Sequence, residues 1–316
     1  MGNYVLRRLV LVVPTLFGIS LLAFGLMRFL PGDVVDQMIG LEATLSPEGR
    51  ATLVRLVGLD VPIHIQYLRW IGGLFQGDLG VSLRTSESIA TIIGQRVGIT
   101  IELALLSVGL SALIAVPLGV LAATRRNGAL DFLAHIVGLV GLSFPNFWLA
   151  TMLLLISSVV FRWQPQLIWV SPFENPVANL QQMAMPVISL SAALMAVVMR
   201  MTRSSMLEVL GQDYVRTARA KGLRERAVLA RHALKNAAIP IITVLGLQIG
   251  YLLGGAVVIE QVFGLPGIGW MILNGIFQRD YSVVQVGILF LAVVFVLVNL
   301  VVDLLYAYMD PRIRYA

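Results

Sequence analysis

Apolar segments long enough to cross a membrane recur along this chain, and they restrict its fold more than any other feature. The hydrocarbon core of a bilayer is about 30 Å thick, a distance that a helix of about 20 apolar residues spans. Only 13% of the 316 residues are charged and 58% are hydrophobic, whereas about a quarter of the residues in a water-soluble domain are charged. The sequence therefore predicts an all-α membrane protein.

The apolar segments predict six transmembrane helices, at about Leu9–Met27, Ile99–Ala123, Phe132–Phe161, Met185–Met199, Ala237–Ile259 and Val283–Tyr308. A cleaved signal peptide is the alternative for the first segment, but no small-x-small cleavage pattern precedes Arg28, which favours a retained helix. Pro145 lies within the third segment and removes a backbone donor, so we expect a kink there. The alternative is a broken helix whose free backbone groups, near Asn146, line a cavity.

The positions of Lys and Arg indicate how the helices are oriented. Residues 202–236 contain eight Lys or Arg and three acidic residues, and cytoplasmic connections are the ones enriched in positive charge. We therefore place this stretch and both termini in the cytoplasm. The formal net charge of +6 reflects this topology and gives no reason to expect a nucleic-acid partner.

The same patterns divide the chain into four regions. Residues 1–30 form the first transmembrane helix, 31–97 a small helical extracytoplasmic insertion, 98–310 a core of five spans that contains the cytoplasmic loop 202–236, and 311–316 a cytoplasmic tail. In the insertion, Ser46-Pro47-Glu48 predicts a helix start with Ser46 as the N-cap.

Residues 213–223 of the cytoplasmic loop predict a short helix with a signal at each end. Asp213 is expected to cap the first amides, and Lys221 suits the negative end of the helix dipole. Gly222 supplies the left-handed residue that ends a helix, and Leu223 supplies the apolar contact that accompanies such an end.

One face of this helix favours docking into a groove. Tyr214 and Ala218 lie four residues apart and share a face that is flanked by small residues. The alternative is a solvated basic loop, the usual explanation of a run of charges. A second helix is expected from Arg224 to Ala238, with Pro240 just beyond it.

Glycines mark two further places. Gly246, Gly250 and Gly254 recur every four residues in the fifth span and predict close packing on another helix. A glycine-rich segment follows this span, so it cannot be the phosphate loop that follows a β-strand, and we expect a tight outer turn instead. The residues that define the turn are Gly264, Pro266, Gly267 and Gly269.

The ionisable residues nearest the spans are Glu102, Glu260 and Asp303. Charge inside a membrane suggests function, but each of these residues lies near a predicted helix end, where hydration at the interface is the simpler explanation. Asp303 has a second explanation, a structural ion pair with a cytoplasmic arginine.

The sequence predicts no catalytic residue and no metal site. It contains no cysteine, and its histidines, His64, His135 and His232, are far apart. It also lacks a G-x-x-x-x-G-K-[ST] phosphate loop, so any ATP must be bound by a partner.

Residues 213–240, DYVRTARAKGL followed by RHALKNAAIP, resemble the cytoplasmic "EAA" loop of the permease subunits of binding-protein-dependent ABC importers. The resemblance is to the branch that takes up dipeptides, oligopeptides, glutathione or nickel. Arg216-Thr217-Ala218 stands where the family has its acid and alanines, so the acidic residue is absent. Further similar segments follow in order: LPGD at 30–33, GDLGVSL at 77–83, LSFPNFW at 142–148, GGAVVIEQVFGLPGIG at 254–269 and RDY at 279–281.

The resemblance implies a permease like those of type I ABC importers, multi-pass in the cell inner membrane, that forms half of a pathway for short peptides. Its partners would be a second, similar permease chain in a heterodimer, two cytoplasmic ATPase subunits that bind ATP and Mg²⁺, and an extracytoplasmic solute-binding protein. The loop helix would couple to the ATPases through Asp213, Tyr214, Arg216, Thr217, Ala218, Ala220, Lys221 and Gly222, and the outer turn would act as a gate.

Three alternatives stay open. Nickel or glutathione uptake is the alternative within the family. An ion-coupled secondary transporter would need ionisable residues deep in its spans. A membrane scaffold that transports nothing would not need a capped docking helix.

Overall fold

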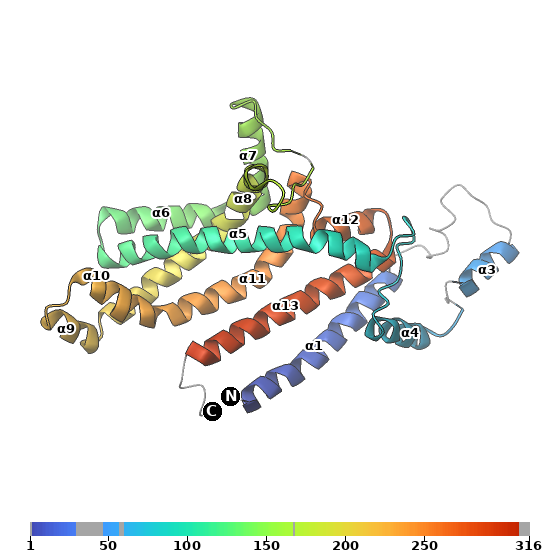
Figure 1. The fold of residues 1–316 in the computed structure, drawn as a ribbon, viewed down its shortest axis with the longest axis horizontal. Helices are drawn as coiled ribbons and strands as arrows, with labels where there is room; N and C mark the ends of the chain where they lie inside the picture. Colours follow the sequence, from blue (N-terminus) through green and yellow to red (C-terminus); the bar gives the residue numbers. More distant parts are fainter. Residues whose placement is uncertain (1, 30–46, 57–59, 167, 310–316) are drawn as a thin grey trace.

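The computed structural model describes residues 2–29, 47–56, 60–166 and 168–309 (Figure 1). Within these ranges the chain consists of helices and connections, apart from one isolated bridge between Val81 and Ser88. The expected Ser46 cap, the segment 30–33 and the tail 311–316 lie outside the described residues. The all-helical prediction is confirmed for the part of the chain that is described.

Four described helices are long and apolar enough to cross a membrane: α5 (Ile89–Thr124), α8 (Pro176–Leu210), α11 (Lys235–Phe263) and α13 (Tyr281–Met309). The pair α6 (Ala129–Ser143) and α7 (Asn146–Val159) passes the same test together, which raises the number to five if the pair counts as one span. The apolar part described in α1 (Gly2–Phe29) is shorter, Val10–Gly25.

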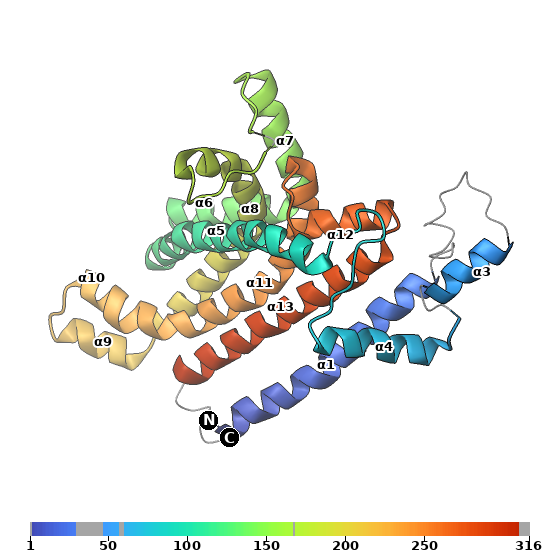
Figure 2. The ribbon, with the colours of Figure 1, turned by 45° about the vertical axis from the view of Figure 1, so that its right-hand side comes forward.

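The third predicted span is broken, and our expectation of a simple proline kink was wrong. α6 and α7 meet at 96° across Phe144 and Pro145. Pro145 has no amide hydrogen to donate, and it forces the preceding residue out of the helical region. Phe144 is accordingly extended, with φ −98° and ψ 128°, and Pro145 is extended as well. Two consecutive extended residues turn the chain sharply, so α7 departs from the direction of α6 (Figure 2).

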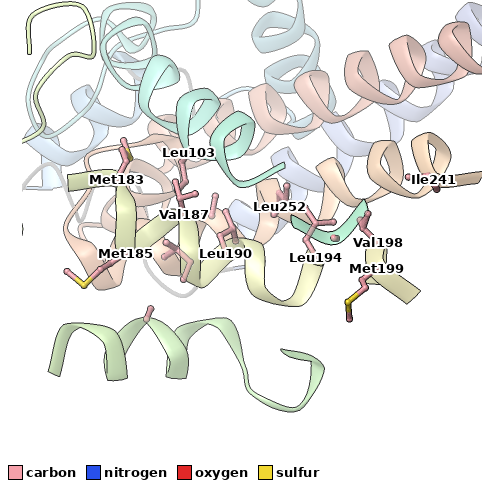
Figure 3. Close-up of a cluster of buried hydrophobic side chains, with 14 of the residues drawn as sticks. Leu103, Met183, Met185, Val187, Leu190, Leu194, Val198, Met199, Ile241 and Leu252 are labelled. Atoms are coloured by element: carbon pink, nitrogen blue, oxygen red, sulfur yellow. The ribbon is translucent and has the colours of Figure 1, made fainter. Parts of the chain in front are cut away.

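α8 is the central helix of the bundle, and α5, α6, α7 and α11 pack against it. In its most apolar window 67% of the residues are buried, against 33% in α5 and 22% in α13. Leu190, Leu194 and Val198 form part of the largest core cluster, together with Leu103 of α5 and Leu252 of α11 (Figure 3). This cluster stabilises the membrane core by close packing.

α5 and α8 are both much longer than predicted, and α8 already begins at Pro176 instead of Met185. α5 begins at Ile89 instead of Ile99, because Ile89, Ile92 and Ile93 are buried against α12 (Ile268–Phe277) and α13. α8 continues past Met199 to Leu210 and so includes the first residues assigned to the cytoplasmic loop.

The two ends of the bundle carry different small helices (Figure 1). α9 (Asp213–Ala220) and α10 (Glu225–Ala227) lie at one end, and the first turn of α1 and the last turn of α13 point toward the same end. α12 and α4 (Ile63–Phe75) lie at the other end, near α3 (Pro47–Leu56).

Aromatic rings attach α4 to α1. The Tyr67 ring contacts Phe17 and Phe24 edge-on, with centroids 6.2 Å and 5.4 Å away, and the Tyr67 and Ser20 hydroxyls lie 2.7 Å apart.

Candidate functional site

Residues 209–228 fold into a small unit at the end of the bundle where the basic loop was predicted. α8 ends at Leu210, and α9 turns back against the start of the next helix. Val215, Ala218 and Val228 are buried together, with Val209 and Leu210 packed around them. Because α9 has an apolar core of its own, the geometry favours a folded unit over a solvated loop. Residues 209–228 are called the docking unit below, after their predicted role.

The two ends of α9 differ in how well they match their sequence signals. Gln212 occupies the N-cap position and no side chain caps the helix, so the prediction that Asp213 is the cap was wrong. Asp213 is instead the first helical residue, where its charge still suits the positive end of the dipole. Gly222 has φ +76°, and its amide donates to the Arg219 carbonyl at 2.9 Å. The left-handed glycine stop is present as predicted.

The predicted docking face has to be redrawn. Ala218 is 6% exposed and points into the unit's own core, whereas Tyr214 is 43% exposed and belongs to the outer face. The two residues therefore do not form one accessible surface. The face that is free for a partner consists of exposed residues of α9 and its stop: Asp213, Tyr214, Arg216, Thr217, Ala220, Lys221 and Gly222.

Arg219 joins the end of α9 to the start of α10. Its Nε donates to Glu225 Oε2 at 3.1 Å and its Nη2 donates to Oε1 at 2.7 Å, a bidentate pair that fixes both side chains. The hydrogen bonds to this carboxylate raise the pKa of the Arg219 guanidinium above its ordinary value. The ion pair connects the two sides of the turn, residues 221–224, that contains Gly222.

The helix after this turn is longer than predicted. α10 continues through a π-helical segment, Val228–Leu234, directly into α11, and the uninterrupted run from Glu225 to Phe263 has 39 residues. The expected end near Ala238 was wrong, because membrane helices tolerate proline and Pro240 lies inside α11. π-Helical turns are rare and occur often at functional sites. This one packs against α9 and α8.

A buried ion pair fixes α8 just before the docking unit, and the sequence reasoning missed it. Arg203 Nε and Nη2 donate to Asp131 Oδ1 and Oδ2 at 2.5 and 2.8 Å, and the Asn127 amide donates to Oδ2 at 3.0 Å. Asp131 is 4% exposed. The pair connects the start of α6 to the end of α8. Arg203 had been counted only as one charge in a basic stretch.

At the other end of the bundle, Glu260 lies beneath the predicted outer turn. The Thr100 hydroxyl donates to its Oε1 at 2.6 Å and the Trp270 amide donates to its Oε2 at 2.9 Å, while Thr100 Oγ1 also accepts from the Ile268 amide at 2.8 Å. Glu260 is fully buried, so the expectation that this acid is hydrated at an interface was wrong. Its carboxylate attaches the turn and the start of α12 to α5.

The outer turn itself has the left-handed residue and the close contacts that require glycine. Gly264 has φ +66°. A Cβ on Gly267 would collide with the Glu260 carboxylate, and one on Gly269 would lie 2.5 Å from Val257 Cα. The turn is therefore held tightly against α11.

A second contact at this end brings together two segments that the sequence reasoning treated separately. Ser82 donates a hydrogen bond to Asp280 Oδ2, and both residues are buried. Asp280 Oδ1 also accepts from the Val283 amide at 3.3 Å, at the start of α13. The GDLGVSL and RDY segments thus form one outer structure with α12.

The three spaced glycines of α11 have different surroundings. A Cβ on Gly246 would collide with Val302 and one on Gly250 with Phe295, both on α13. Gly254 has no described atom within 4 Å of a Cβ position, so it does not share that contact.

A cavity of about 560 Å³ lies among α7, α8 and α11. Asn146, at the start of α7, and Gln248 supply polar groups to a lining that is otherwise mostly apolar, and Tyr251 lies at 78% exposure beside them. Asn146, the first residue of α7 after the break, therefore gives the cavity lining a polar side chain.

Two further acids lie on the predicted spans. Glu102 on α5 and Asp303 on α13 are partly exposed. Within the described residues, no three His, Asp or Glu side chains come close enough to hold a metal ion.

The fold and its two structured ends define a multi-pass α-helical membrane protein, and comparisons with known proteins establish its family. The family described as "Binding-protein-dependent transport system inner membrane component" matches residues 115–315, and its N-terminal companion matches residues 1–104. The chain belongs to this family of inner-membrane transport components.

Relatives cover the chain from end to end. It is 41% identical over 338 aligned positions to the dipeptide transport system permease protein DppB of Escherichia coli K12, covering 100% of this chain and 99% of the relative. It is 39% identical to the oligopeptide transport system permease protein AppB of Bacillus subtilis, with both chains fully covered. It is 40% identical to the glutathione transport system permease protein GsiC of E. coli O6:H1, again with both fully covered.

A solved structure shares the fold. A chain from an inward-facing structure of the MetNI methionine ABC transporter superimposes with a TM-score of 0.54 at 15% identity. The match covers 69% of this chain and 96% of that chain, and at this identity it supports the fold alone.

Proposed function

We propose that this chain is one of two permease subunits of an ATP-driven importer for short peptides. The observation that carries this proposal is the 41% identity, over the whole chain, to a dipeptide permease. The chain would have six spans with both termini in the cytoplasm. The first turn of α1 and the last turn of α13 point toward the end that carries α9, which supports this topology (Figure 1).

The outer face of α9 would bind a cytoplasmic ATPase subunit. This face carries Tyr214, Arg216 and Thr217, while the opposite face is fixed by Val215 and the Arg219–Glu225 pair. A rigid helix loses little conformational entropy when it docks, so it suits a contact that transmits force. ATP and Mg²⁺ would be bound by two such ATPase subunits and not by this chain.

The cavity that contains Asn146, Gln248 and Tyr251 would be this chain's share of the solute pathway. It opens on the bundle surface, where a second permease chain would complete it. The amide groups offer hydrogen bonds to a peptide backbone without a net charge, which suits solutes of differing sequence.

An extracytoplasmic solute-binding protein would dock at the opposite end. The turn 264–269, α12 and the Ser82–Asp280 contact form a rigid platform there. Buried hydrogen bonds hold the platform, so the binding protein would meet a preformed surface.

Glutathione is the second candidate solute, because GsiC is 40% identical over the full chain. Nickel uptake stays an alternative within the family. An ion-coupled transporter is less well supported, since the buried carboxylates among the described residues lie near helix ends and accept hydrogen bonds: Asp131 from Arg203, Glu260 from Thr100 and Asp280 from Ser82.

Affinity purification of the chain in mild detergent, followed by mass spectrometry, tests the assembly. We expect ATPase subunits and a second permease to copurify, and the ATPases to be lost when Tyr214 and Arg216 are both replaced by alanine. The matched control replaces the exposed Arg125 and Arg126, on another connection at the same end, and should retain the ATPases. A chain that purifies alone and moves solute into liposomes without ATP would favour the secondary transporter.

The solute is tested separately with the reconstituted assembly and its binding protein. Uptake of a labelled dipeptide should be competed by unlabelled dipeptide more strongly than by glutathione or Ni²⁺. Stronger competition by glutathione would assign the chain to the second candidate.

A further inference from the structure

An apolar groove lies between α6 and α8, outside the docking unit, and shares only Leu142 with the lining of the proposed solute cavity. Its volume is about 350 Å³. Phe132, Leu139 and Leu142 of α6 form one wall, and Ala196 and Met199 of α8 form the other. The side chains that line it are apolar over most of its length, so water molecules there would find few hydrogen-bond partners.

Basic side chains gather at one end of this groove. Arg200, Arg203 and His135 line it near the α5–α6 connection, whereas Leu142 and Ala196 line the opposite end. The Arg203–Asp131 pair fixes the register of the two helices at this point. Arg200 lies three residues before Arg203, which places it about 4.5 Å farther into the bundle along α8.

Arg200 is the unusual member of this group. Its side chain is exposed in a helix long and apolar enough to span a membrane, and it forms no ion pair or hydrogen bond with any described residue. Charged groups at such positions normally find a partner, because the bilayer cannot solvate them. Arg203 uses Nε and Nη2 for Asp131 and has no described partner for Nη1.

We propose that an anionic glycerophospholipid of the cytoplasmic leaflet occupies this groove. Its phosphate lies between Arg200 and Nη1 of Arg203, with His135 beside it, and an acyl chain extends past Leu139 toward Leu142. Basic pockets between transmembrane helices on the cytoplasmic side are suited to anionic headgroups. The inference rests on the proposed orientation of the chain and is independent of the solute.

Charge favours a lipid over a protein segment in this groove. Asp131, which is not part of the lining, is paired with Arg203, so Arg200 gives the groove end a net positive charge. A transmembrane segment of another protein would have to bring an acid to this depth. A phospholipid has both the negative phosphate and the apolar chain in the required order.

Native mass spectrometry of the full-length chain in detergent tests the proposal, with phosphatidylglycerol and phosphatidylcholine of identical acyl chains as probes. We expect the wild-type protein to retain phosphatidylglycerol preferentially. Arg200→Gln should weaken phosphatidylglycerol retention about fivefold, the effect of one basic residue on an anionic lipid. Arg200→Lys should keep most of the preference. Glycerol 3-phosphate should not compete, because it lacks the chain that fills the groove.

The matched control is Arg231→Gln, which removes an exposed charge on the π-helical segment and should leave lipid retention unchanged. Equal retention of the two lipids by the wild-type chain would overturn the proposal, and so would unchanged phosphatidylglycerol retention by Arg200→Gln.

A second measurement asks whether another protein covers the groove instead. The chain has no cysteine, so Leu139→Cys, at a position that is 69% exposed, provides a single thiol. In membranes that contain the assembled complex, a lipid-soluble maleimide should label this thiol, and added phosphatidylglycerol should slow labelling in the purified complex. Protection of the thiol by a crosslinkable second permease chain would assign the groove to a subunit interface and overturn the lipid proposal.

Discussion

The Glu260 carboxylate lies directly against Gly267, where a Cβ would collide with both carboxylate oxygens. The buried carboxylate thus fills the space that a side chain at position 267 would need, so only glycine fits there. The carboxylate is also where Thr100 of α5 and the Trp270 amide of α12 meet. Three helices and one turn depend on this contact.

Gly267→Ala should therefore destabilise the protein. The new methyl group would displace the carboxylate from its donors, and overpacking of this kind costs about 1–3 kcal/mol. We expect a lower Tm for the variant in detergent. Gly254→Ala is the control, because no described atom lies within 4 Å of its Cβ position, and its Tm should stay the same or rise slightly. Equal Tm values for the two variants would contradict the prediction, because they would show that the turn accommodates the methyl group without loss of stability.

Glu260→Gln should weaken the same contact without changing its size. The two carboxylate oxygens accept one hydrogen bond each, from the Thr100 hydroxyl and the Trp270 amide. In glutamine an NH₂ group replaces one of these oxygens, and it cannot accept a hydrogen bond. Leaving a buried hydrogen-bond donor unsatisfied costs about 1–3 kcal/mol. Thermal unfolding should show the loss, and Glu102→Gln, at a partly exposed position, should change Tm much less. A Tm for Glu260→Gln at the wild-type value would mean that the acid is already neutral.

Arg203→Ala should be strongly destabilising, because it leaves the Asp131 carboxylate buried without its cation. Breaking one side of a buried pair costs about 3 kcal/mol or more. Arg203→Ala with Asp131→Ala should recover part of the loss, so a double-mutant cycle in Tm measures the coupling. Arg216→Ala is the control, since its pair with Asp213 is solvent-exposed and its removal should leave Tm unchanged. Additive losses at Asp131 and Arg203 would contradict the prediction.

Gly222→Val should separate membrane insertion from coupling. The glycine has φ +76°, a conformation that is costly for a β-branched residue, so the end of α9 should distort. We expect normal insertion and expression but loss of solute-stimulated ATPase activity in the reconstituted assembly. Gly211→Val is the control, because Gly211 has φ −78° and accommodates a side chain without strain. Solute-stimulated ATPase activity at the wild-type level in Gly222→Val would show that α9 does not couple the permease to the ATPases.

Local signals in the sequence predicted much of this architecture. The apolar segments located α5, α8, α11 and α13, because helices in a membrane must satisfy their own backbone. Gly222 predicted the end of α9, because a left-handed residue at a helix end is a local requirement. The outer turn at Gly264 was expected for another local reason, a glycine-rich segment directly after a membrane span.

Contacts between distant residues could not be predicted in this way. Asp131 and Arg203 are 72 residues apart, and Thr100 and Glu260 are 160 apart, so nothing local shows that either pair meets. The direction of Ala218 depends on Val228, which only the folded loop brings close. Pro145 and Pro240 show the same limit. One breaks its helix and the other lies within a continuous one, and their sequences alone do not distinguish the two outcomes.

The unbroken run from Glu225 to Phe263 has a mechanical consequence. At about 1.5 Å per residue its 39 residues reach roughly 58 Å, from the Arg219–Glu225 pair to the turn that Glu260 holds. The run is not uniform, because the π-helical segment Val228–Leu234, Pro240 and several glycines lie within it, and helices bend at such positions. A displacement at α9 would therefore reach the outer turn reduced by whatever bending these positions allow.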